Sequence, residues 1–282
     1  MENNMIQINP VAFHLLGLPV RWYAIIIACA MLLSVELALR EVERKGFDSD
    51  RVMDLLMWAI PLGFVGARIY YVLFEWEYYS QHLGQIIAIW NGGIAIYGGI
   101  IAAVITAYVY ARRWGFSVRF LADVAAPYLL LAQAIGRWGN FVNREAHGGL
   151  ASESFLREVL HLPSFIVDRM LINGSYYHPT FLYESVWNLL GVGLLLFLRR
   201  KKNFLRLGDT ALLYVIWYAF GRFFIEGVRT DSLYLGPFRV SQMLSLILFI
   251  VGGSLFLYRR YHQEKAPYYS QFHGPFKKVR KS

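Results

Sequence analysis

The sequence is poor in cysteine and in charged residues. Its 282 residues include one cysteine, Cys29, and only 17% are Asp, Glu, Lys or Arg. A single cysteine excludes an intrachain disulfide, and Cys29 lies in an apolar run, where a thiol is typical of a packing residue rather than a nucleophile. We expect no cleavable signal peptide, because residues 1–19 lack a basic region, an apolar run and a small-residue site in that order. The histidines lack the spacing of metal ligands, so we predict neither a metal site nor a cofactor.

Long apolar runs dominate the chain instead. Hydrophobic residues make up 57% of it. Runs of about 17–22 such residues are long enough to cross a bilayer as helices. We therefore predict an all-α polytopic membrane protein with seven transmembrane helices. The predicted spans are residues 20–39, 52–74, 94–112, 120–137, 180–198, 209–228 and 240–258.

The positions of Lys and Arg predict the orientation in the membrane. With seven spans, the strongly basic segments all fall on one side, which we assign to the cytoplasm; the amino terminus then lies outside and the carboxyl terminus inside. The net charge of +9 is thereby explained by topology and by attraction to anionic lipid, and we predict no nucleic-acid binding. The basic segments are 40–51, 112–119, 199–206 and 259–281.

These spans predict two parts of unequal size. Residues 1–262 form an integral membrane domain, with an outward insertion at about 140–178 that forms a small domain between the fourth and fifth spans. Residues 263–282 form a basic cytoplasmic tail.

Polar residues concentrate at the predicted outer end of the fourth span. The fourteen residues 136–149 read Gly-Arg-Trp-Gly-Asn-Phe-Val-Asn-Arg-Glu-Ala-His-Gly-Gly and include two arginines, two asparagines, a glutamate and four glycines. Asn and Glu beside Arg supply acceptors and donors in one place, and glycines let a backbone approach a ligand or a helix closely. A hydrated loop that merely ends the helix is the alternative interpretation.

Charged residues also fall in the outer halves of other predicted spans. Arg222, Glu226 and Arg229 stand at i, i+4 and i+7 and so share one helical face, which inside a membrane should point to the bundle interior or a wet cavity. A cluster of arginines at headgroup depth is suited to bind a lipid phosphate, because guanidinium donates bidentately and stays charged. We expect nothing comparable in the inner half. The outer group is Arg68, Tyr97, Arg137, Glu145, Glu184, Arg222 and Glu226.

Several of these segments carry a resemblance to a known family. From the residues alone, Tyr23 is interpreted as an interfacial belt residue and the glycines of residues 92–99 as a helix-packing face. Taken together, however, the chain resembles the prolipoprotein diacylglyceryl transferase family over nearly its whole length. The segments are Trp22-Tyr23, Gly-Gly-Ile-Ala-Ile-x-Gly-Gly at 92–99, Asp123 within 122–127, Gly-Arg-x-Gly-Asn-Phe-x-Asn-x-Glu at 136–145, His-Pro-Thr-x-Leu-Tyr-Glu at 178–184 and Gly-Arg-Phe-x-x-Glu-x-x-Arg at 221–229.

The resemblance implies an enzyme of the bacterial cytoplasmic membrane. Its substrates are phosphatidylglycerol and prolipoproteins, and it transfers the diacylglyceryl group to the thiol of the lipobox cysteine, releasing glycerol phosphate in the first step of lipoprotein maturation. By motif, the catalytic residues are Arg137, Arg222, Tyr97 and Glu145. The residues that bind phosphatidylglycerol are Arg137, Arg222, Asn140, Tyr23, Gly148, Glu226 and Arg229.

One position departs from the family pattern. Members often carry histidine where this chain has Tyr97, and that histidine is the group usually proposed to take the thiol proton. Tyr97 is the first candidate for the base and His147 the second. A membrane transporter and a catalytically impaired paralogue are the competing hypotheses, although a transporter should carry charges at the midplane and on both sides.

Overall fold

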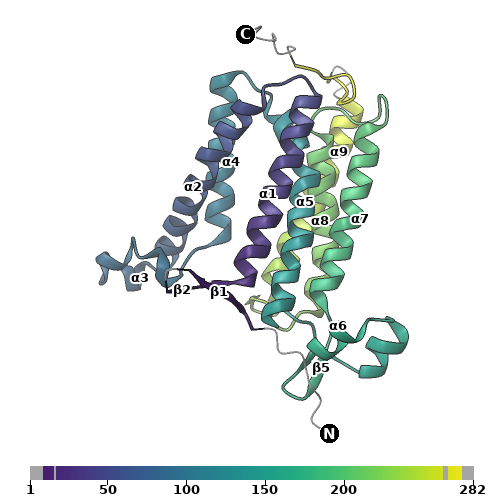
Figure 1. The fold of residues 1–282 in the computed structure, drawn as a ribbon. Coiled ribbons are helices and arrows are strands. Elements are labelled where there is room, and N and C mark those ends of the chain that lie inside the picture. Colours follow the sequence, from purple (N-terminus) through teal and green to yellow (C-terminus); the bar gives the residue numbers. More distant parts are fainter. Residues whose placement is uncertain (1–8, 16, 263–265, 275–282) are drawn as a thin grey trace. The chain divides into compact units, whose positions relative to one another are not determined.

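Helices dominate the part of the chain that the structure describes, residues 9–15, 17–262 and 266–274 (Figure 1). The structure is a computed structural model. Each predicted span overlaps one long helix of this part. These helices are α1 Trp22–Arg44, α2 Ser49–Phe74, α4 Ile96–Trp114, α5 Val118–Asn143, α7 Thr180–Arg200, α8 Asp209–Val228 and α9 Val240–His262.

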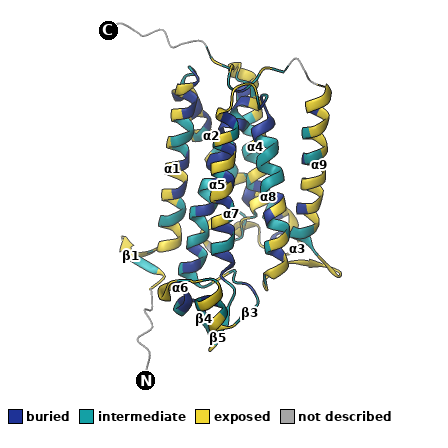
Figure 2. Cartoon of the chain, turned by 90° about the vertical axis from the view of Figure 1, so that its right-hand side faces the viewer, coloured by how far each residue is buried: buried dark blue, intermediate teal, exposed yellow. Residues whose placement is uncertain are grey.

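Six of these helices are long and apolar enough to cross a membrane, all but α4. Helix α4 has 19 residues and carries Arg112 and Arg113 in its last turn. Large apolar side chains lie unburied along the helices, among them Leu32 at 70% and Phe197 at 67% exposure (Figure 2). Such surfaces are unusual in water but fit a hydrocarbon environment. The chain is thus mostly helical and consistent with a polytopic membrane protein.

The chain divides into two compact units. Unit 1 comprises residues 1–38 and 122–272, and unit 2 comprises residues 39–121 and 273–282. In unit 1, α5 and α7 pack through buried Ala126, Leu130 and Leu195, with Trp217 of α8 against them. Unit 1 holds most residues of the predicted site.

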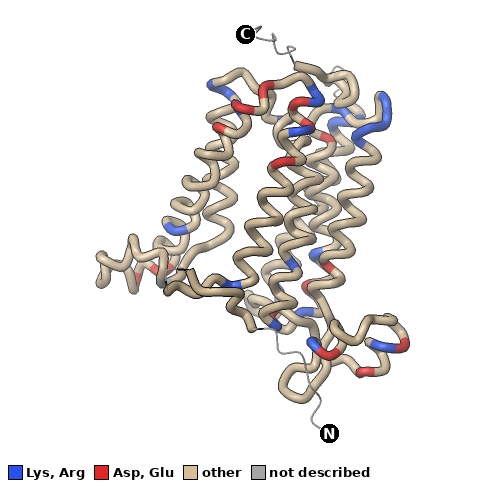
Figure 3. The backbone as a smooth tube through the Cα atoms, in the orientation of Figure 1, with Lys and Arg blue, Asp and Glu red and all other residues tan. Residues whose placement is uncertain are grey.

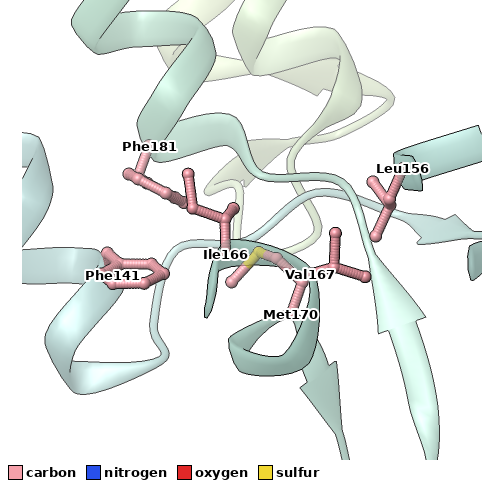
Figure 4. Packing of buried hydrophobic residues seen from close by; sticks show 6 residues of the cluster. All are labelled: Phe141, Leu156, Ile166, Val167, Met170 and Phe181. Atoms are coloured by element: carbon pink, nitrogen blue, oxygen red, sulfur yellow. The ribbon is translucent and has the colours of Figure 1, made fainter. Parts of the chain in front are cut away.

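The insertion between α5 and α7 has a core of its own. It contains β3 Leu150–Ala151, the π-helix η3 Phe155–Val159, α6 Ser164–Arg169, β4 Leu171–Ile172 and β5 Ser175–Tyr177. The strands form an antiparallel sheet in the order β3-β5-β4. Leu156, Ile166, Val167 and Met170 pack together with the ends of the two flanking helices, Phe141 and Phe181 (Figure 4). This core fixes the insertion to the helix ends that carry the polar residues.

Two short antiparallel hairpins were not predicted from the sequence. Strands β1 Val11–Leu15 and β2 Leu18–Arg21 precede α1, and β6 Tyr234–Leu235 and β7 Phe238–Arg239 connect α8 to α9. The all-α prediction is therefore incomplete. Strands of two to five residues carry too little alternation to be recognised in an apolar sequence.

The end of α5 differs from the prediction. We expected the fourth span to end at Arg137, but the helix continues to Asn143, so the glycines at 136 and 139 lie inside it. They provide contact surface for α1: a Cβ at Gly136 would lie 3.0 Å from Cδ1 of Ile27. The extra turns are capped by Arg169 of α6, which donates to the carbonyls of Phe141 and Val142.

In unit 2, two glycines bring α2 and α4 into backbone contact. A Cβ on Gly98 would lie 2.4 Å from the carbonyl oxygen of Gly66, and one on Gly66 would lie 2.4 Å from Cβ of Ala102. This agrees with interpreting the glycine-rich segment as a packing face. The connection between these helices contains α3 Trp76–Tyr79, η1 Leu83–Gln85 and η2 Ile89–Asn91.

Unit 1 also has a buried charged cluster at the opposite end of its helices, where the sequence predicted nothing comparable. Asp123 of α5, which is fully buried, accepts hydrogen bonds of 2.6 and 2.9 Å from the backbone N–H groups of Gly208 and Ala211, and so caps α8. Arg199 donates to the carbonyl of Asp123, and its guanidinium lies 5.3 Å from the ring of buried Tyr269. Figure 3 shows basic segments at this end of α7 and α9.

Tyr269 belongs to the predicted basic tail. Residues 263–265 and 275–282 of that tail lie outside the described residues. Within the remainder, the backbone of Tyr269 pairs with that of Leu205, and the backbone of Leu207 with that of Pro267.

Candidate functional site

One buried carboxylate contacts three arginines in unit 1. Glu184, in the second turn of α7, is only 4% exposed. Its Oε2 lies 2.5 Å from Nε of Arg137. Its Oε1 accepts a 3.0 Å hydrogen bond from Nη1 of Arg222 and lies 3.5 Å from Nη1 of Arg229. Because the arginines come from α5, from α8 and from the residue after α8, this carboxylate connects three segments that are distant in the sequence.

The charged face predicted for α8 is present and meets the same carboxylate. Nη2 of Arg222 lies 2.6 Å from Oε2 of Glu226, one turn later, and Glu226 is 2% exposed. Arg229 donates through Nε and Nη2 to the two carboxylate oxygens of Asp231, at 2.9 and 2.7 Å. Both arginines are thus oriented by carboxylates on two sides.

Arg137 begins a chain of hydrogen bonds along the polar segment 136–149. Its Nη1 donates to Oδ1 of Asn140 at 3.4 Å, and Nδ2 of Asn140 donates to Oε1 of Glu145 at 3.0 Å. Asn143 donates to the same Glu145 oxygen at 3.3 Å. In the described structure Glu145 therefore reaches Arg137 only through Asn140, and the carboxylate in direct contact with the arginine is Glu184.

Gly148 allows the segment after the signature to pass between two helix ends. Its N–H donates to the carbonyl of His178 at 2.9 Å, and the N–H of Gly149 donates to the carbonyl of Val228 at 2.9 Å. A Cβ on Gly148 would lie 2.7 Å from Cβ of His178 and 3.0 Å from Cγ1 of Val228. Since real Cβ atoms do not approach so closely, glycine is required for the start of α7 and the end of α8 to stay at this spacing.

Tyr23 packs against α5 at Gly139. A Cβ on Gly139 would lie 2.5 Å from Cδ2 of the Tyr23 ring, so the ring occupies the space above that glycine. The Tyr23 side chain remains partly accessible, with the residue 37% exposed. The structure thus brings Tyr23 to the helix that carries Arg137 and Asn140.

Two tryptophans fix the register of α7 against α8. The indole N–H of Trp187 donates to the carbonyl of Trp217 at 3.1 Å, and the indole N–H of Trp217 donates to the carbonyl of Trp187 at 3.0 Å. Their rings stack with centroids 4.1 Å apart. Trp187 covers Gly221, the residue before Arg222, at a position where a Cβ would be 2.1 Å from its Nε1. This reciprocal pair holds Glu184 and Arg222 at bonding distance.

Arg137 has donor capacity left for an anion. Its side chain is 23% exposed, against 16% for Arg222 and 12% for Arg229. Guanidinium has five N–H bonds, and Nη2 of Arg137 donates to no residue that the structure describes. The three guanidiniums outnumber the buried carboxylates of Glu184 and Glu226 by one positive charge, which half-exposed Asp231 offsets. The geometry is suited to binding a phosphate group.

The cluster offers anion-binding groups rather than metal ligands. Across the described ranges, no group of three or more His, Cys, Asp or Glu side chains is placed to hold a metal ion. His147, the second candidate base, has its Nδ1 3.0 Å from the carbonyl oxygen of Gly148, to which a protonated Nδ1 donates. Its ring centroid lies 4.2 Å from that of Tyr177.

Two residues of the predicted outer group belong to unit 2. Arg68 is 6% exposed and donates to four carbonyls of the α2–α4 connection. These hydrogen bonds, 2.6–2.8 Å long, hold the connection between the two helices. We expected Arg68 in a cluster of arginines that binds phosphate, but its guanidinium donates to backbone carbonyls instead. Tyr97, in the first turn of α4, is 44% exposed. The carbonyls bonded by Arg68 are those of Gln85, Ile86, Gly92 and Gly93.

Sequence reasoning placed Glu184 in the outer group but did not assign it a catalytic or lipid-binding role. The structure makes it the carboxylate that contacts all three arginines. The available signal was its depth: a carboxylate just inside a span, with no basic residue one turn away on its own helix, needs cations from other helices.

Comparison with known proteins agrees with the motifs. The family model described as prolipoprotein diacylglyceryl transferase matches residues 10–258. Three bacterial relatives are named phosphatidylglycerol–prolipoprotein diacylglyceryl transferase. The protein of Listeria welshimeri is 54% identical over 271 residues, 96% of each chain. That of Lactobacillus delbrueckii subsp. bulgaricus is 54% identical over 90% of this chain and 92% of its own, and that of Ligilactobacillus salivarius is 52% identical over 94% and 98%. The chain belongs to the prolipoprotein diacylglyceryl transferase family.

Proposed function

We propose that this protein transfers the diacylglyceryl group of phosphatidylglycerol to the cysteine thiol in the lipobox of a prolipoprotein. The observation that carries the proposal is the group of three arginines on buried Glu184, built from the motifs that the family shares. The names of the relatives support the two substrates. A transporter is not favoured, because the relatives are named as transferases.

The reaction needs stabilisation of a leaving phosphate. The sulfur attacks the phosphate-bearing carbon of the diacylated glycerol. A carbon–sulfur bond forms there, and the carbon–oxygen bond to the phosphate breaks with its electron pair remaining on the phosphate oxygen. The products are a thioether and glycerol phosphate, which together with the released thiol proton balance the reactants. Negative charge grows on the phosphate as the bond breaks, so preorganised cations there lower the barrier.

Arg137 and Arg222 are the residues that we assign to the phosphate. Arg137 supplies the unused Nη2 donors, and Arg222 retains Nε and one N–H on each terminal nitrogen. Glu184 positions both guanidiniums, and Glu226 and Arg229 complete the network around them. Asn140 links Arg137 to Glu145. Gly148 and Tyr23 determine how the segments that carry these groups pack. The supporting residues are therefore Tyr23, Asn140, Glu145, Gly148, Glu226 and Arg229.

We assign the thiol proton to Tyr97 first and to His147 second. A phenol acts as a base only with its pKa lowered from about 10, whereas a free thiol ionises near pH 8.5, so a hydrogen-bonding role for Tyr97 is the alternative within this proposal. His147 is the weaker candidate because its ring packs on Tyr177 and its Nδ1 contacts a backbone carbonyl.

We further propose seven spans, with α4 as the additional one, in the bacterial cytoplasmic membrane. Helix α4 contacts α2 through glycines, and its outer surface exposes Val104 at 62% and Ile100 at 54%, as lipid-facing residues would. The basic connections then lie in the cytoplasm, together with the carboxyl terminus, and the insertion between α5 and α7 lies outside with the amino terminus.

The test is transfer by purified protein. Phosphatidylglycerol labelled in its acyl chains is incubated with a lipobox peptide, using wild type, Tyr97→Phe and Tyr97→His. We expect labelled thioether peptide with wild type, a loss in Tyr97→Phe and retention in Tyr97→His. Transfer unchanged in Tyr97→Phe removes Tyr97 from the chemistry, and no transfer by wild type contradicts the proposed function.

A further inference from the structure

Arg68 is a buried cation that is held by backbone carbonyls. The residue lies in α2 and is 6% exposed, and no Asp or Glu of the described ranges pairs with it. All three nitrogens of its guanidinium donate to backbone carbonyls, in four hydrogen bonds. The rings of Tyr79 and Tyr71 lie 5.1 and 6.0 Å from the guanidinium carbon. These contacts use most of its donor capacity and indicate a positioning role rather than anion binding.

The four carbonyls belong to two separate points of the α2–α4 connection. Gln85 and Ile86 lie at the end of η1, and Gly92 and Gly93 precede α4. A guanidinium donates from three nitrogens in one plane, so this single side chain connects both points to α2. Lysine has all its donors on one nitrogen and cannot reproduce the geometry.

Gly93 allows the guanidinium to approach the chain. Its φ of +75° is rare for other residues, and a Cβ there would lie 2.6 Å from Nη1 of Arg68 and 2.7 Å from Cε1 of Tyr71. A Cβ on Gly84, in η1 of the same connection, would have nothing within 4 Å. Alanine at position 93 therefore displaces the Arg68 side chain, whereas alanine at position 84 does not.

The start of α4 lacks a side-chain cap and is held by α2 instead. Helices commonly begin with Ser, Thr, Asp or Asn, whose side chain accepts from a free N–H of the first turn. The N-cap of α4 is Ala95, which offers no such acceptor, and its own N–H donates to the carbonyl of Ala67 at 3.0 Å. Arg68 holds the carbonyls just before Ala95, and Gly98 packs on α2 just after it. Tyr97 lies between these contacts, in the first turn.

We propose that Arg68 is a positioning residue that acts through Tyr97. Its hydrogen bonds fix the first turn of α4 against α2, and the Tyr97 side chain, 44% exposed, is placed by that turn. The inference rests on the proposed function, in which Tyr97 takes the thiol proton or hydrogen-bonds the thiol. Loss of the Arg68 contacts leaves the arginines that we assign to the phosphate unchanged, because they belong to unit 1, but lets the phenol move.

The first test measures the kinetics of transfer in the full-length protein. Arg68→Lys should lower kcat by about 10- to 100-fold, because displacing a catalytic group by about 1 Å can cost about 10²-fold, while KM for phosphatidylglycerol stays within about twofold. Gly93→Ala, whose Cβ displaces the guanidinium, should have the same effect. Gly84→Ala is the matched control in the same connection and should keep the kcat of wild type.

The second test follows position 97 with a nitroxide label. Cys29→Ala removes the single cysteine of the chain, so that a label can be attached to Tyr97→Cys or, as the control farther along α4, to Tyr108→Cys. The two tyrosines are similarly exposed, at 44% and 48%. Arg68→Lys should increase the mobility of the label at position 97 in the electron paramagnetic resonance spectrum and leave the label at position 108 unchanged.

Several outcomes would overturn the positioning role and leave the proposed function standing. They are a kcat of Arg68→Lys within about threefold of wild type, a loss that appears in KM, and a label at position 97 that is unchanged or changes no more than that at 108. Unchanged transfer by Tyr97→Phe would do the same, because Arg68 would then have no catalytic group to position. If Arg68→Lys does not fold, Gly93→Ala against Gly84→Ala makes both comparisons. Absence of transfer by wild type refutes the proposed function and this inference together.

Discussion

Neutralising Glu184 is the perturbation to which the described network is most sensitive. Glu184→Gln keeps the shape but removes the charge, and whichever way the amide turns, Arg137 or Arg222 faces an N–H donor in place of an acceptor. Removing one member of a buried ion pair costs about 3–5 kcal/mol. Because Glu184 is 4% exposed and contacts three guanidiniums, the full penalty applies.

The assay for this variant is the kcat/KM of diacylglyceryl transfer to a lipobox peptide. A loss of 3–5 kcal/mol of arginine positioning corresponds to a decrease of at least about 100-fold. Glu153→Gln is the control, because Glu153 pairs with Arg157 at 2.7 Å but both side chains are exposed, at 48% and 36%. Such surface pairs contribute about 0–1 kcal/mol, so the control should act like wild type. Activity of Glu184→Gln within about threefold of wild type, in folded protein, refutes the positioning role.

Three further predictions concern the surrounding structure. Gly221→Ala places a Cβ 2.1 Å from Nε1 of Trp187, so it should lower the stability by about 1–3 kcal/mol and with it Tm and kcat. Gly193→Ala is the control, because a Cβ there has nothing within 4 Å, and it should change neither quantity. Equal Tm values for the two variants would contradict the packing argument. Asp123→Asn weakens the cap of α8 and should lower Tm in a thermal unfolding experiment, with an unchanged Tm as the contrary result. The hydrogen bond from Arg229 holds the pKa of Asp231 below its usual value, so the stability it contributes is present above about pH 4 and is lost as pH falls further. The Tm difference between wild type and Asp231→Asn should therefore shrink in acid, and a difference that grows in acid would contradict this pairing.

The helices were predictable from the sequence because a membrane span needs a long apolar run, and each run appears as one helix. The extent of α5 was not predictable: Gly139 lies beyond the predicted end of the span at Arg137, but the helix continues through it, with the Tyr23 ring packed over this glycine. The short hairpins gave no usable signal either. Local composition does not predict such contacts between residues that are distant in the sequence.

The sequence grouped Arg137, Glu184 and Arg222 in one region, but it did not predict which of these side chains pair. Arg222 and Glu226 are neighbours on one helix, so spacing alone indicated their contact. The contacts of Glu184 join residues 38 or more positions apart and depend on helix rotation and register, which the Trp187–Trp217 pair determines. Arg68 was grouped with the site residues, yet carbonyls of the connection between α2 and α4 accept its hydrogen bonds.

The most direct test of the central claim is transfer by Arg137→Ala and Arg222→Ala, with Arg157→Ala as the matched control on the exposed insertion. If the two guanidiniums stabilise the leaving phosphate, each variant should insert and fold but lose about 10²–10³-fold or more in kcat, while the control keeps wild-type transfer. Near-normal transfer of the diacylglyceryl group by either Arg137→Ala or Arg222→Ala would contradict the account.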